Sequence, residues 1–283
     1  MSKIRYFILP IVVSALLTGC AADAVKENVS AVPSETKSTT NVAETTPVAD
    51  GMDYRQYSSD KVVWGPGRAD GHERPRDPVL LQEQYGALGA EFIGGDKKEI
   101  YLTFDEGYEN GYTPAILDTL KEKGVKAAFF VTYDFAQSNP GLVRRMLDEG
   151  HAVGNHTYRH LTMDEIGIDR ATEEIVFLDS FISQNFDYKM TLFRFPKGEF
   201  SERTLALAKE LGYTSVFWSF AYSDWDTENP PDKAQALDLI TKHTHNGEIM
   251  LLHAVSETNA AILGDVIDAA REQGYEFAKL PQA

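Results

Sequence analysis

The sequence predicts an α/β fold, a distorted (β/α)7 barrel of parallel strands that forms one domain. Short apolar runs typical of strands alternate with helical patterns from residue 99 to the end of the chain. The connections between these runs are long enough for the crossovers that parallel strands require. The runs are also continuously apolar, as expected for a sheet that is buried on both faces. An open, doubly wound sheet is the second possibility.

The expected strands and helices follow one another in alternation. Cap residues support several boundaries, since Pro114 stands at the start of a helix, Gly124 ends one and Ser201 caps another. Strands are expected at residues 100–104, 127–132, 152–155, 191–195, 213–219, 248–253 and 275–280. Helices are expected at residues 115–123, 140–149, 170–184, 202–211, 231–241 and 258–273. Residues 53–98 lack clear periodicity and are expected to form an N-terminal extension packed on the outside of a domain at residues 99–283.

The first 52 residues do not resemble a part of this domain. Lys3 and Arg5 precede an apolar run too short to span a membrane, so residues 1–19 are predicted to be a lipoprotein signal peptide. The run ends in Leu-Thr-Gly-Cys, which resembles the lipobox of bacterial lipoproteins, and Cys20 is the only cysteine of the chain. Residues 20–52 are therefore expected to be a lipidated cysteine and a disordered tether. The alternative is an ordinary signal peptide followed by a chance cysteine.

Composition narrows the classes of partner. Apolar residues make up 43% of the chain, which is enough for a hydrophobic core. The formal net charge of −16 argues against nucleic acid as a partner, because phosphate backbones are bound by basic surfaces. An anionic substrate would have to be met by local basic residues. The Gly-x-Ser-x-Gly motif and a phosphate-binding glycine loop are both absent, so neither a serine esterase nor a nucleotide-binding enzyme is expected.

Four short motifs place chemically reactive residues at the ends of apolar strands. They are Thr-Phe-Asp-Glu-Gly (103–107), His-Thr-Tyr-Arg-His (156–160), Arg-Phe-Pro-Lys-Gly (194–198) and Leu-Leu-His (251–253). The active sites of β/α barrels are built at the carboxyl ends of the strands. The ordered set of carboxylates, histidines and an arginine therefore predicts a metal-assisted hydrolase.

His156 and His160 are expected to bind one metal ion, because on a helical turn this spacing puts both imidazoles on one side. A zinc protease would have a glutamate directly after the first histidine, and here that residue is Thr157. Asp105 and Glu106 could complete a site of two histidines and one carboxylate, with positions left for water and substrate. Two solvated histidines and a plain polar turn are the alternatives.

Further residues near strand ends fit such a site. His253 is placed to act as a general acid, although a hydrogen-bonded core histidine is the alternative. Arg194 could hold a catalytic carboxylate in its charged form, and Asp224 could fix that arginine in turn. Trp225 is either a wall on which sugars stack or a core residue. Together these residues would supply a base, an acid and a substrate wall at one end of the barrel.

The chain from about residue 97 to residue 280 resembles the polysaccharide deacetylase family, carbohydrate esterase family four, whose motifs appear here in order. The resemblance implies a distorted barrel and a metal-dependent hydrolase that removes acetyl groups from a glycan. It also implies roles for individual residues. Asp105 is the implied general base and His253 the general acid; His156 and His160 bind the divalent metal, expected to be zinc; Arg194 orients the base and is tethered by Asp224; Trp225 and Leu251 line the acetyl pocket; the backbone N–H at Lys197 stands at the oxyanion hole.

Two positions depart from the family pattern. Glu106 stands where the family has a second aspartate as metal ligand, so its longer side chain requires a shifted ion. In the third motif, Phe195 and Lys197 replace a proline and a tyrosine. The stretches 103–113 and 251–260 resemble the delta-lactam-forming deacetylases, which act on N-acetylmuramic acid of peptidoglycan in spore-forming bacteria.

The sequence therefore predicts an extracytoplasmic protein, anchored to the cell membrane as a lipoprotein, that removes N-acetyl groups from N-acetylmuramic acid of peptidoglycan. Lys197 is expected to receive the lactyl carboxylate that distinguishes this sugar from N-acetylglucosamine. Three alternatives stay open: an N-acetylglucosamine deacetylase acting on peptidoglycan or chitin-like chains, an esterase for acetylated polysaccharides, and a catalytically silent wall-binding module. The presence of Asp105, the histidines and Arg194 argues against the silent module.

Overall fold

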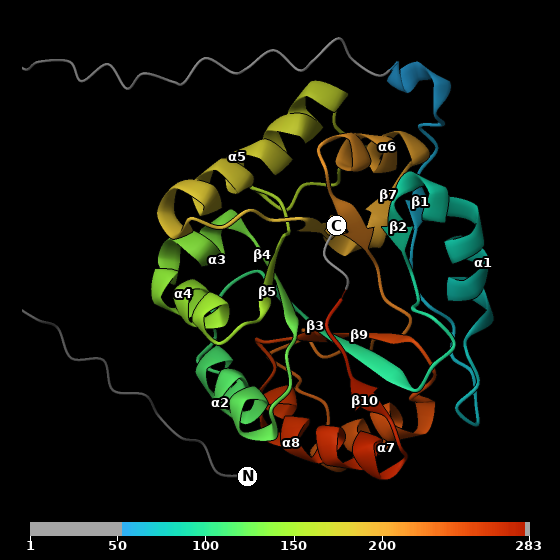
Figure 1. Cartoon of the computed structure of the whole chain (residues 1–283), viewed down its shortest axis with the longest axis vertical. Helices are drawn as coiled ribbons and strands as arrows, with labels where there is room; N and C mark the ends of the chain where they lie inside the picture. The colour runs from blue at the N-terminus through green and yellow to red at the C-terminus, as the bar shows by residue number, and fades with distance from the viewer. Residues whose placement is uncertain (1–52, 281–283) are drawn as a thin grey trace, which may run out of the picture. The chain divides into compact units, whose positions relative to one another are not determined.

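The computed structural model describes residues 53–280 of the chain. Parallel strands run through the middle of this part, and helices lie on the outside of the strands (Figure 1). The strands are β1 (Val62–Val63), β2 (Ala90–Glu91), β3 (Glu99–Glu106), β4 (Ala128–Val131), β5 (Ala152–Asn155), β6 (Leu192–Phe193), β7 (Glu199–Phe200), β8 (Thr214–Val216), β9 (Glu248–His253) and β10 (Glu276–Phe277). The helices are α1 (Arg76–Tyr85), α2 (Thr113–Lys123), α3 (Tyr133–Ser138), α4 (Pro140–Asp148), α5 (Ile168–Phe186), α6 (Glu202–Glu210), α7 (Lys233–His243) and α8 (Glu257–Glu272).

The main sheet is a distorted barrel of parallel strands. Its strand order is β10-β3-β4-β5-β6-β8-β2, and β9 pairs with β3. A single parallel bridge between Phe220 and Met250 links the chain that follows β8 to β9. The pairing thus passes around the barrel but is reduced to one residue pair at this point. The predicted distorted (β/α)7 barrel in a single domain is confirmed.

Most predicted elements are present, with ends that differ by a few residues. Gly124 ends α2 in a left-handed conformation with φ 64°, which a residue without Cβ adopts readily. Ser201 begins α6 with a capping box that it shares with Thr204. Two helices, α1 and α3, were not expected, because α1 lies in a segment without periodicity and α3 is only six residues long.

The segment before residue 99 is more than the outer extension that the sequence suggested. β1 pairs antiparallel with β7, and β2 is a strand of the barrel sheet, parallel to β8. Phe92 is fully buried and stacks on Phe217 at 4.2 Å between ring centroids. The domain boundary expected at residue 98 is therefore wrong, because β2 lies before it and belongs to the barrel. A strand of two residues between glycines is too short to show a periodic signal.

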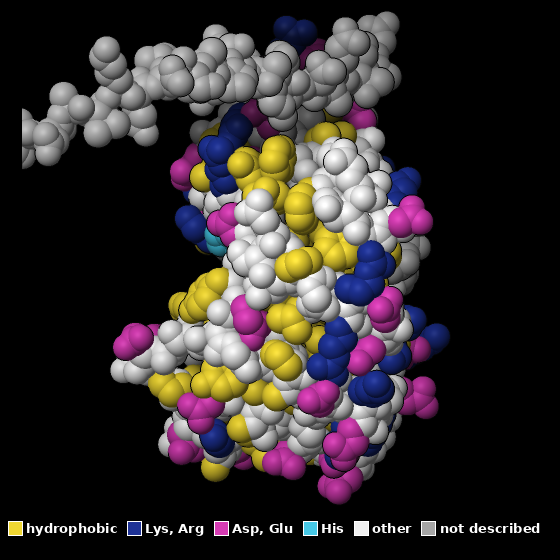
Figure 2. Space-filling view, turned by 90° about the vertical axis from the view of Figure 1, so that its left-hand side faces the viewer, with side chains coloured by type: hydrophobic (Ala, Val, Ile, Leu, Met, Phe, Trp, Pro, Cys, Tyr) yellow, Lys and Arg dark blue, Asp and Glu magenta, His cyan; other side chains and the backbone are white. Residues whose placement is uncertain are grey.

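The surface formed by the helices α2 to α5 is mixed in character. Figure 2 shows acidic, basic and apolar side chains interspersed on this face of the molecule. Val176 and Phe177 of α5 are among the exposed large apolar residues. Within residues 53–280, no helix combines the length and the hydrophobicity that a membrane crossing needs. The predicted signal peptide, Cys20 and the tether lie outside the described residues.

Candidate active site

Reactive side chains gather at the carboxyl ends of the barrel strands. Asp105 is the penultimate residue of β3, His156 follows β5, Arg194 follows β6 and His253 ends β9. Since parallel strands end at the same edge of a sheet, residues far apart in the sequence meet here. Asp105 and His253 stand directly opposite one another in the register of β3 and β9. This common edge brings one residue of each motif, Asp105, His156, Arg194 and His253, to the same end of the barrel.

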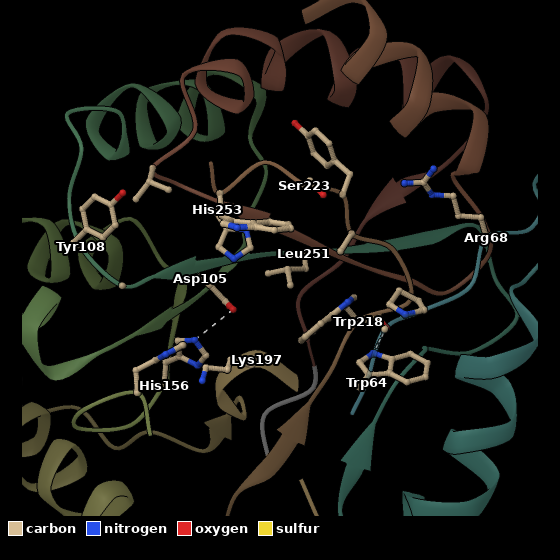
Figure 3. A pocket seen from close by; sticks show the side chains of 18 residues that line it. Trp64, Arg68, Asp105, Tyr108, His156, Lys197, Trp218, Ser223, Leu251 and His253 are labelled. Carbon is tan, nitrogen blue, oxygen red and sulfur yellow. Dashed lines mark hydrogen bonds and ion pairs between the residues drawn. The ribbon is translucent and has the colours of Figure 1, made fainter. Parts of the chain in front are cut away.

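The site is a cleft of about 690 Å³ (Figure 3). Predicted residues that line it are Asp105, His156, His160, Lys197, Trp225, Leu251 and His253. The cleft wall also contains residues that the sequence analysis missed, among them Trp64, Arg68, Tyr108, Trp218 and Tyr222. Trp64 and Arg68 come from the segment before the predicted domain, and Tyr108 is 54% exposed in the loop after β3. The aromatic residue type could have drawn attention to Trp64, Tyr108, Trp218 and Tyr222, whereas Arg68 had no such signal.

Arg194 holds Asp105 in place at the floor of the cleft. Its Nη1 donates to Oδ1 of Asp105 at 2.8 Å, and its Nη2 donates to Oγ1 of Thr103 at 2.9 Å. A third donor, Nε, reaches the carbonyl oxygen of Val216 at 3.0 Å. Burial by itself would raise the pKa of Asp105, but the Arg194 guanidinium outweighs it and the pKa lies below its usual value. Asp105 is therefore a fixed carboxylate whose second oxygen is left for other partners.

His156 presents one ring nitrogen to this second oxygen. Its Nδ1 lies 2.9 Å from the carbonyl oxygen of Arg194 and must carry a proton to donate to it. Burial lowers the pKa of His156, so the ring is neutral and Nε2 carries a lone pair. This Nε2 lies 3.5 Å from Oδ2 of Asp105. Two electron-rich atoms that face each other in this way favour a cation beside them.

The two histidines meet, but on a loop and not on the helical turn that their spacing suggested. Thr157 and His160 have positive φ values of 72° and 55°, which no helix contains. Side-chain hydrogen bonds hold this conformation: Asn155 Oδ1 accepts from the Thr157 N–H, and Thr157 Oγ1 accepts from the His160 N–H. The ring centroids of His156 and His160 lie 4.8 Å apart. Desolvation and the neighbouring His156 lower the pKa of His160 to about 4, so it too is neutral.

Glu106 is not brought to the two histidines. Successive side chains of a strand point to opposite faces, and Glu106 lies on the face of β3 away from Asp105. Its carboxylate is fully buried, and Oγ1 of Thr113 lies 3.4 Å from each of its oxygens. Burial raises its pKa well above the usual value. This placement disagrees with the expected role of Glu106 as a metal ligand.

The donor set fits a metal ion through two imidazoles. Both rings are neutral, and the Nδ1–H of His156 is bonded to a backbone carbonyl, as is usual for histidine ligands. The Asp105 oxygen beside His156 Nε2 would be further stabilised by a cation. Within residues 53–280, however, no group of three or more histidine, cysteine or carboxylate side chains is arranged to hold an ion by itself. Water or substrate would have to complete the coordination.

Asp224 pairs with His253 and not with Arg194. The carboxylate accepts from His253 twice, at 2.7 Å from Nδ1 and at 2.8 Å from the backbone N–H. Asn259 donates to the same carboxylate at 2.5 Å. Burial acts to lower the pKa of His253, but the bond to Asp224 overcomes it and the pKa is raised. The expected tether between Asp224 and Arg194 is therefore wrong, and Asn259 is a supporting residue that was missed.

The predicted substrate residues all border the cleft. Leu251 is 3% exposed and lies on its floor, whereas Trp225 is 58% exposed and its ring lies 6.3 Å from that of His253. Lys197 is exposed on the side of His156, with its Nζ 3.4 Å from Oγ1 of Thr162 (Figure 3). Its φ of 60° places it in the left-handed region. The buried apolar Leu251 and the exposed aromatic ring of Trp225 give the cleft a surface suited to an acetylated sugar.

The amino-acid sequence is similar to those of known proteins. The sequence profile of the polysaccharide deacetylase family matches residues 93–216. The peptidoglycan-N-acetylmuramic acid deacetylase PdaA of Bacillus subtilis is 40% identical over 224 residues, which is 78% of this chain and 85% of that protein. The chain belongs to the polysaccharide deacetylase family. Its relatives include enzymes named for acetyl removal from peptidoglycan, and deacetylases of this family are metal-dependent.

Solved structures of polysaccharide deacetylases agree with the fold. The structure of B. subtilis PdaA, described as a family 4 carbohydrate esterase, has a TM-score of 0.75 and 39% identity. The match covers 78% of this chain and 96% of that one. A family 4 carbohydrate esterase from Bacillus anthracis has a TM-score of 0.65 and 39% identity, and the match covers 79% and 95% of the two chains. The barrel is thus the fold of this family.

Proposed function

We propose that this polysaccharide deacetylase hydrolyses the N-acetyl group of N-acetylmuramic acid in peptidoglycan. The arrangement of Asp105 and His253 carries the proposal. One is a fixed carboxylate with a free oxygen and the other is an imidazole with a raised pKa, and both face one cleft. Hydrolysis of an amide needs such a pair, because water must lose a proton and the departing nitrogen must gain one. The name of a relative with 40% identity gives the same sugar.

Asp105 is proposed to begin the reaction as general base. It takes a proton from a water molecule, and the resulting hydroxide attacks the carbonyl carbon of the acetyl group. Arg194 keeps the carboxylate ionised before this step and holds the reactive oxygen in a fixed direction. A divalent metal on His156 and His160, which we propose to be zinc, would supply Lewis-acid polarisation of the carbonyl and a lowered pKa for water.

His253 is proposed to complete the reaction as general acid. Its ring gives a proton to the sugar nitrogen, the C–N bond breaks, and acetate leaves together with the free amino sugar. Asp224 accepts from Nδ1, so the opposite nitrogen, Nε2, is the one that serves the cleft. The backbone N–H at Lys197 is the proposed oxyanion donor, since Lys197 lines the cleft beside the histidines.

The lactyl group decides between the two peptidoglycan sugars. Once its peptide is removed, N-acetylmuramic acid has a carboxylate that N-acetylglucosamine lacks. Lys197 is a cation on the cleft wall of a protein with a net charge of −16, and it is proposed to receive this carboxylate. The same catalytic residues would act on N-acetylglucosamine chains, so this sugar is the second candidate.

We also propose that the protein acts outside the cytoplasm, attached to the membrane by lipid on Cys20. The apolar run that ends in Leu-Thr-Gly-Cys supports this location. Peptidoglycan lies on the same side of the membrane, so a tether of residues 20–52 would leave the domain within reach of its substrate. Cys20 has no second cysteine with which to form an internal disulfide.

Release of acetate from purified cell-wall glycan tests the proposed activity. The wild-type protein should release acetate, and Asp105→Asn should release it on the order of 10²-fold more slowly, because an amide cannot accept the proton. Asp118→Asn changes an exposed carboxylate of α2 outside the cleft and is the matched control. Equal rates for wild type and Asp105→Asn, or no acetate from any wall glycan, would contradict a deacetylase with Asp105 as base.

A further inference from the structure

An unpaired arginine borders the cleft on the side away from Lys197. Arg68 is exposed and, within residues 53–280, it has no hydrogen bond and no ion pair. Figure 3 shows Lys197 beside His156, whereas Arg68 lies across the cleft, beyond Leu251 and Ser223. The catalytic residues thus lie between two cationic side chains.

The segment that contains Arg68 is attached to the barrel at Trp64. The neighbouring Trp64 is 6% exposed, and its indole N–H donates to the carbonyl oxygen of Trp218 at 3.0 Å. The backbone N–H of Trp64 donates to the carbonyl oxygen of Gly198, also at 3.0 Å. Gly198 must be small here, because a Cβ would lie 2.8 Å from the Trp218 ring. The segment is therefore fastened to the barrel four residues before Arg68.

The charge balance of the cleft favours an anion. Arg68 and Lys197 are the cations among the described residues that line it. The one acidic residue among these is Asp105, which is already neutralised by Arg194. In a protein of net charge −16, these two cations give the cleft a local positive charge that suits an anionic ligand.

We propose that Arg68 binds the carboxylate of a second muramic acid residue, one that is not being deacetylated. This inference rests on the proposed function. Peptidoglycan strands alternate N-acetylglucosamine and N-acetylmuramic acid, so a peptide-free strand presents a lactyl carboxylate on every other sugar. With one carboxylate at Lys197 beside the reacting sugar, the next carboxylate along the strand is proposed to lie at Arg68, across the cleft. Arginine suits this task, since its planar guanidinium pairs with a carboxylate through two parallel hydrogen bonds.

Arg68 would then make the binding affinity depend on the length of the glycan chain. A disaccharide has one muramic acid and can occupy only the Lys197 side, whereas a tetrasaccharide has two and can occupy both sides. The tetrasaccharide should therefore bind more tightly than the disaccharide, and only this gain should depend on Arg68. A charge-assisted hydrogen bond of this kind corresponds to about tenfold or more in affinity.

Binding of peptide-free disaccharide and tetrasaccharide, measured by calorimetry, tests this inference. The ligands are titrated into Asp105→Asn protein, in which the slowed reaction leaves time to measure binding. Adding Arg68→Ala should weaken tetrasaccharide binding about tenfold and leave disaccharide binding unchanged. Arg76→Ala, which removes an exposed arginine from the start of α1 outside the cleft, should change neither. Conversion of the tetrasaccharide carboxylates to methyl amides should weaken its binding to protein that keeps Arg68. With this neutral ligand, Arg68→Ala should not reduce any further the preference for tetrasaccharide over disaccharide.

Equal losses for both ligands on Arg68→Ala, or an unchanged preference for the tetrasaccharide, would overturn the role of Arg68. The proposed function has a separate readout, which is the loss of acetyl from muramic acid when active wild-type protein treats the same tetrasaccharide. A tetrasaccharide that binds through Arg68 but loses acetyl only from N-acetylglucosamine would support the Arg68 site and contradict the choice of sugar.

Discussion

Asp224 and His253 are joined by two hydrogen bonds at the edge of the cleft. One carboxylate oxygen of Asp224 accepts from Nδ1 of His253 at 2.7 Å, and the other accepts from the His253 backbone N–H at 2.8 Å. Asn259 donates to Asp224 and also to the His253 carbonyl oxygen, while the Tyr222 hydroxyl donates to Asn259. The pair fixes both the tautomer and the orientation of the histidine, so its other ring nitrogen faces the substrate.

Replacing Asp224 by asparagine should shift the pH dependence of the reaction. Asp224 raises the pKa of His253, and a general acid works only while it is protonated. Activity is therefore lost as the pH rises through the pKa of His253, and Asp224→Asn should move this basic limb to lower pH. At neutral pH kcat should fall by on the order of tenfold or more. Profiles of kcat/KM against pH measure the shift.

The neighbouring carboxylate of Asp226 supplies the control for this experiment. Asp226 is exposed and bonds to Asn229 within its own loop, so Asp226→Asn should leave the basic limb where it is. A basic limb that does not move in Asp224→Asn would show that His253 is not the group that titrates there.

Metal binding should depend on the two histidines and not on Glu106. His156→Ala or His160→Ala should remove most of the bound metal and at least about 10²-fold of the rate, because each removes a donor nitrogen. Glu106→Gln should keep the metal, since Glu106 bonds to Thr113 on the other face of β3. Elemental analysis of dialysed protein measures the metal content, with His72→Ala as a control outside the cleft. Loss of metal in Glu106→Gln would contradict this prediction and show that Glu106 is needed to bind the ion.

Glu106→Gln should also change the pH dependence of stability in chelated protein. The folded-state pKa of Glu106 lies well above its usual value of 4.5, so the folded state binds this proton more tightly than the unfolded state. The free energy of unfolding of the wild type therefore decreases as the pH rises above 4.5 toward the folded pKa. The variant lacks this decrease and should gain stability relative to the wild type over that range. Urea unfolding at several pH values measures the difference, and parallel profiles would contradict the buried placement.

Lys197→Ala should lower activity on peptide-free muramic acid by about tenfold through KM, because it removes the proposed partner of the lactyl carboxylate. Activity on N-acetylglucosamine oligomers should be unchanged. Lys189→Ala removes an exposed lysine outside the cleft and is the matched control. A Lys197 variant that loses activity equally on both sugars would assign the residue to the shared chemistry and not to sugar choice.

Cys20→Ala should leave the protein without its lipid anchor. The thiol is the proposed site of lipidation, and alanine cannot be acylated in this way. Fractionation of cells that express the full chain should find the variant in the medium, or at the membrane with an uncleaved signal peptide. A variant that remains at the membrane at the mature size would contradict the lipoprotein proposal.

The sequence predicted the strands and the motif residues at their ends, because apolar runs and polar strand ends are local signals. It could not predict which strand-end groups meet. Asp224 could reach either Arg194 or His253 by its place in the chain, and only the way in which β8 and β9 meet around the barrel selects His253. The opposite direction of Glu106 from Asp105 does follow from the two-residue period of a strand.

Two other features had no clear local signal. The loop from His156 to His160 depends on left-handed residues held by Asn155 and Thr157 side chains, and the spacing alone favoured a helical turn. Arg68 lies in a segment without periodicity, so nothing in the chain near it indicates that it borders the cleft. Such residues are brought to the site by contacts between distant segments, here by Trp64 with Trp218.

Mass spectrometry of peptide-free glycan strands after treatment with the wild-type protein tests the central claim most directly. Strands are treated, cut to disaccharides, and each sugar is identified by its fragments. The account predicts that muramic acid loses the mass of one acetyl group and that N-acetylglucosamine keeps its acetyl group. In the same treatment time, Asp105→Asn should leave the mass of both sugars unchanged. Acetyl loss confined to N-acetylglucosamine, or an unchanged mass for both sugars, would contradict it.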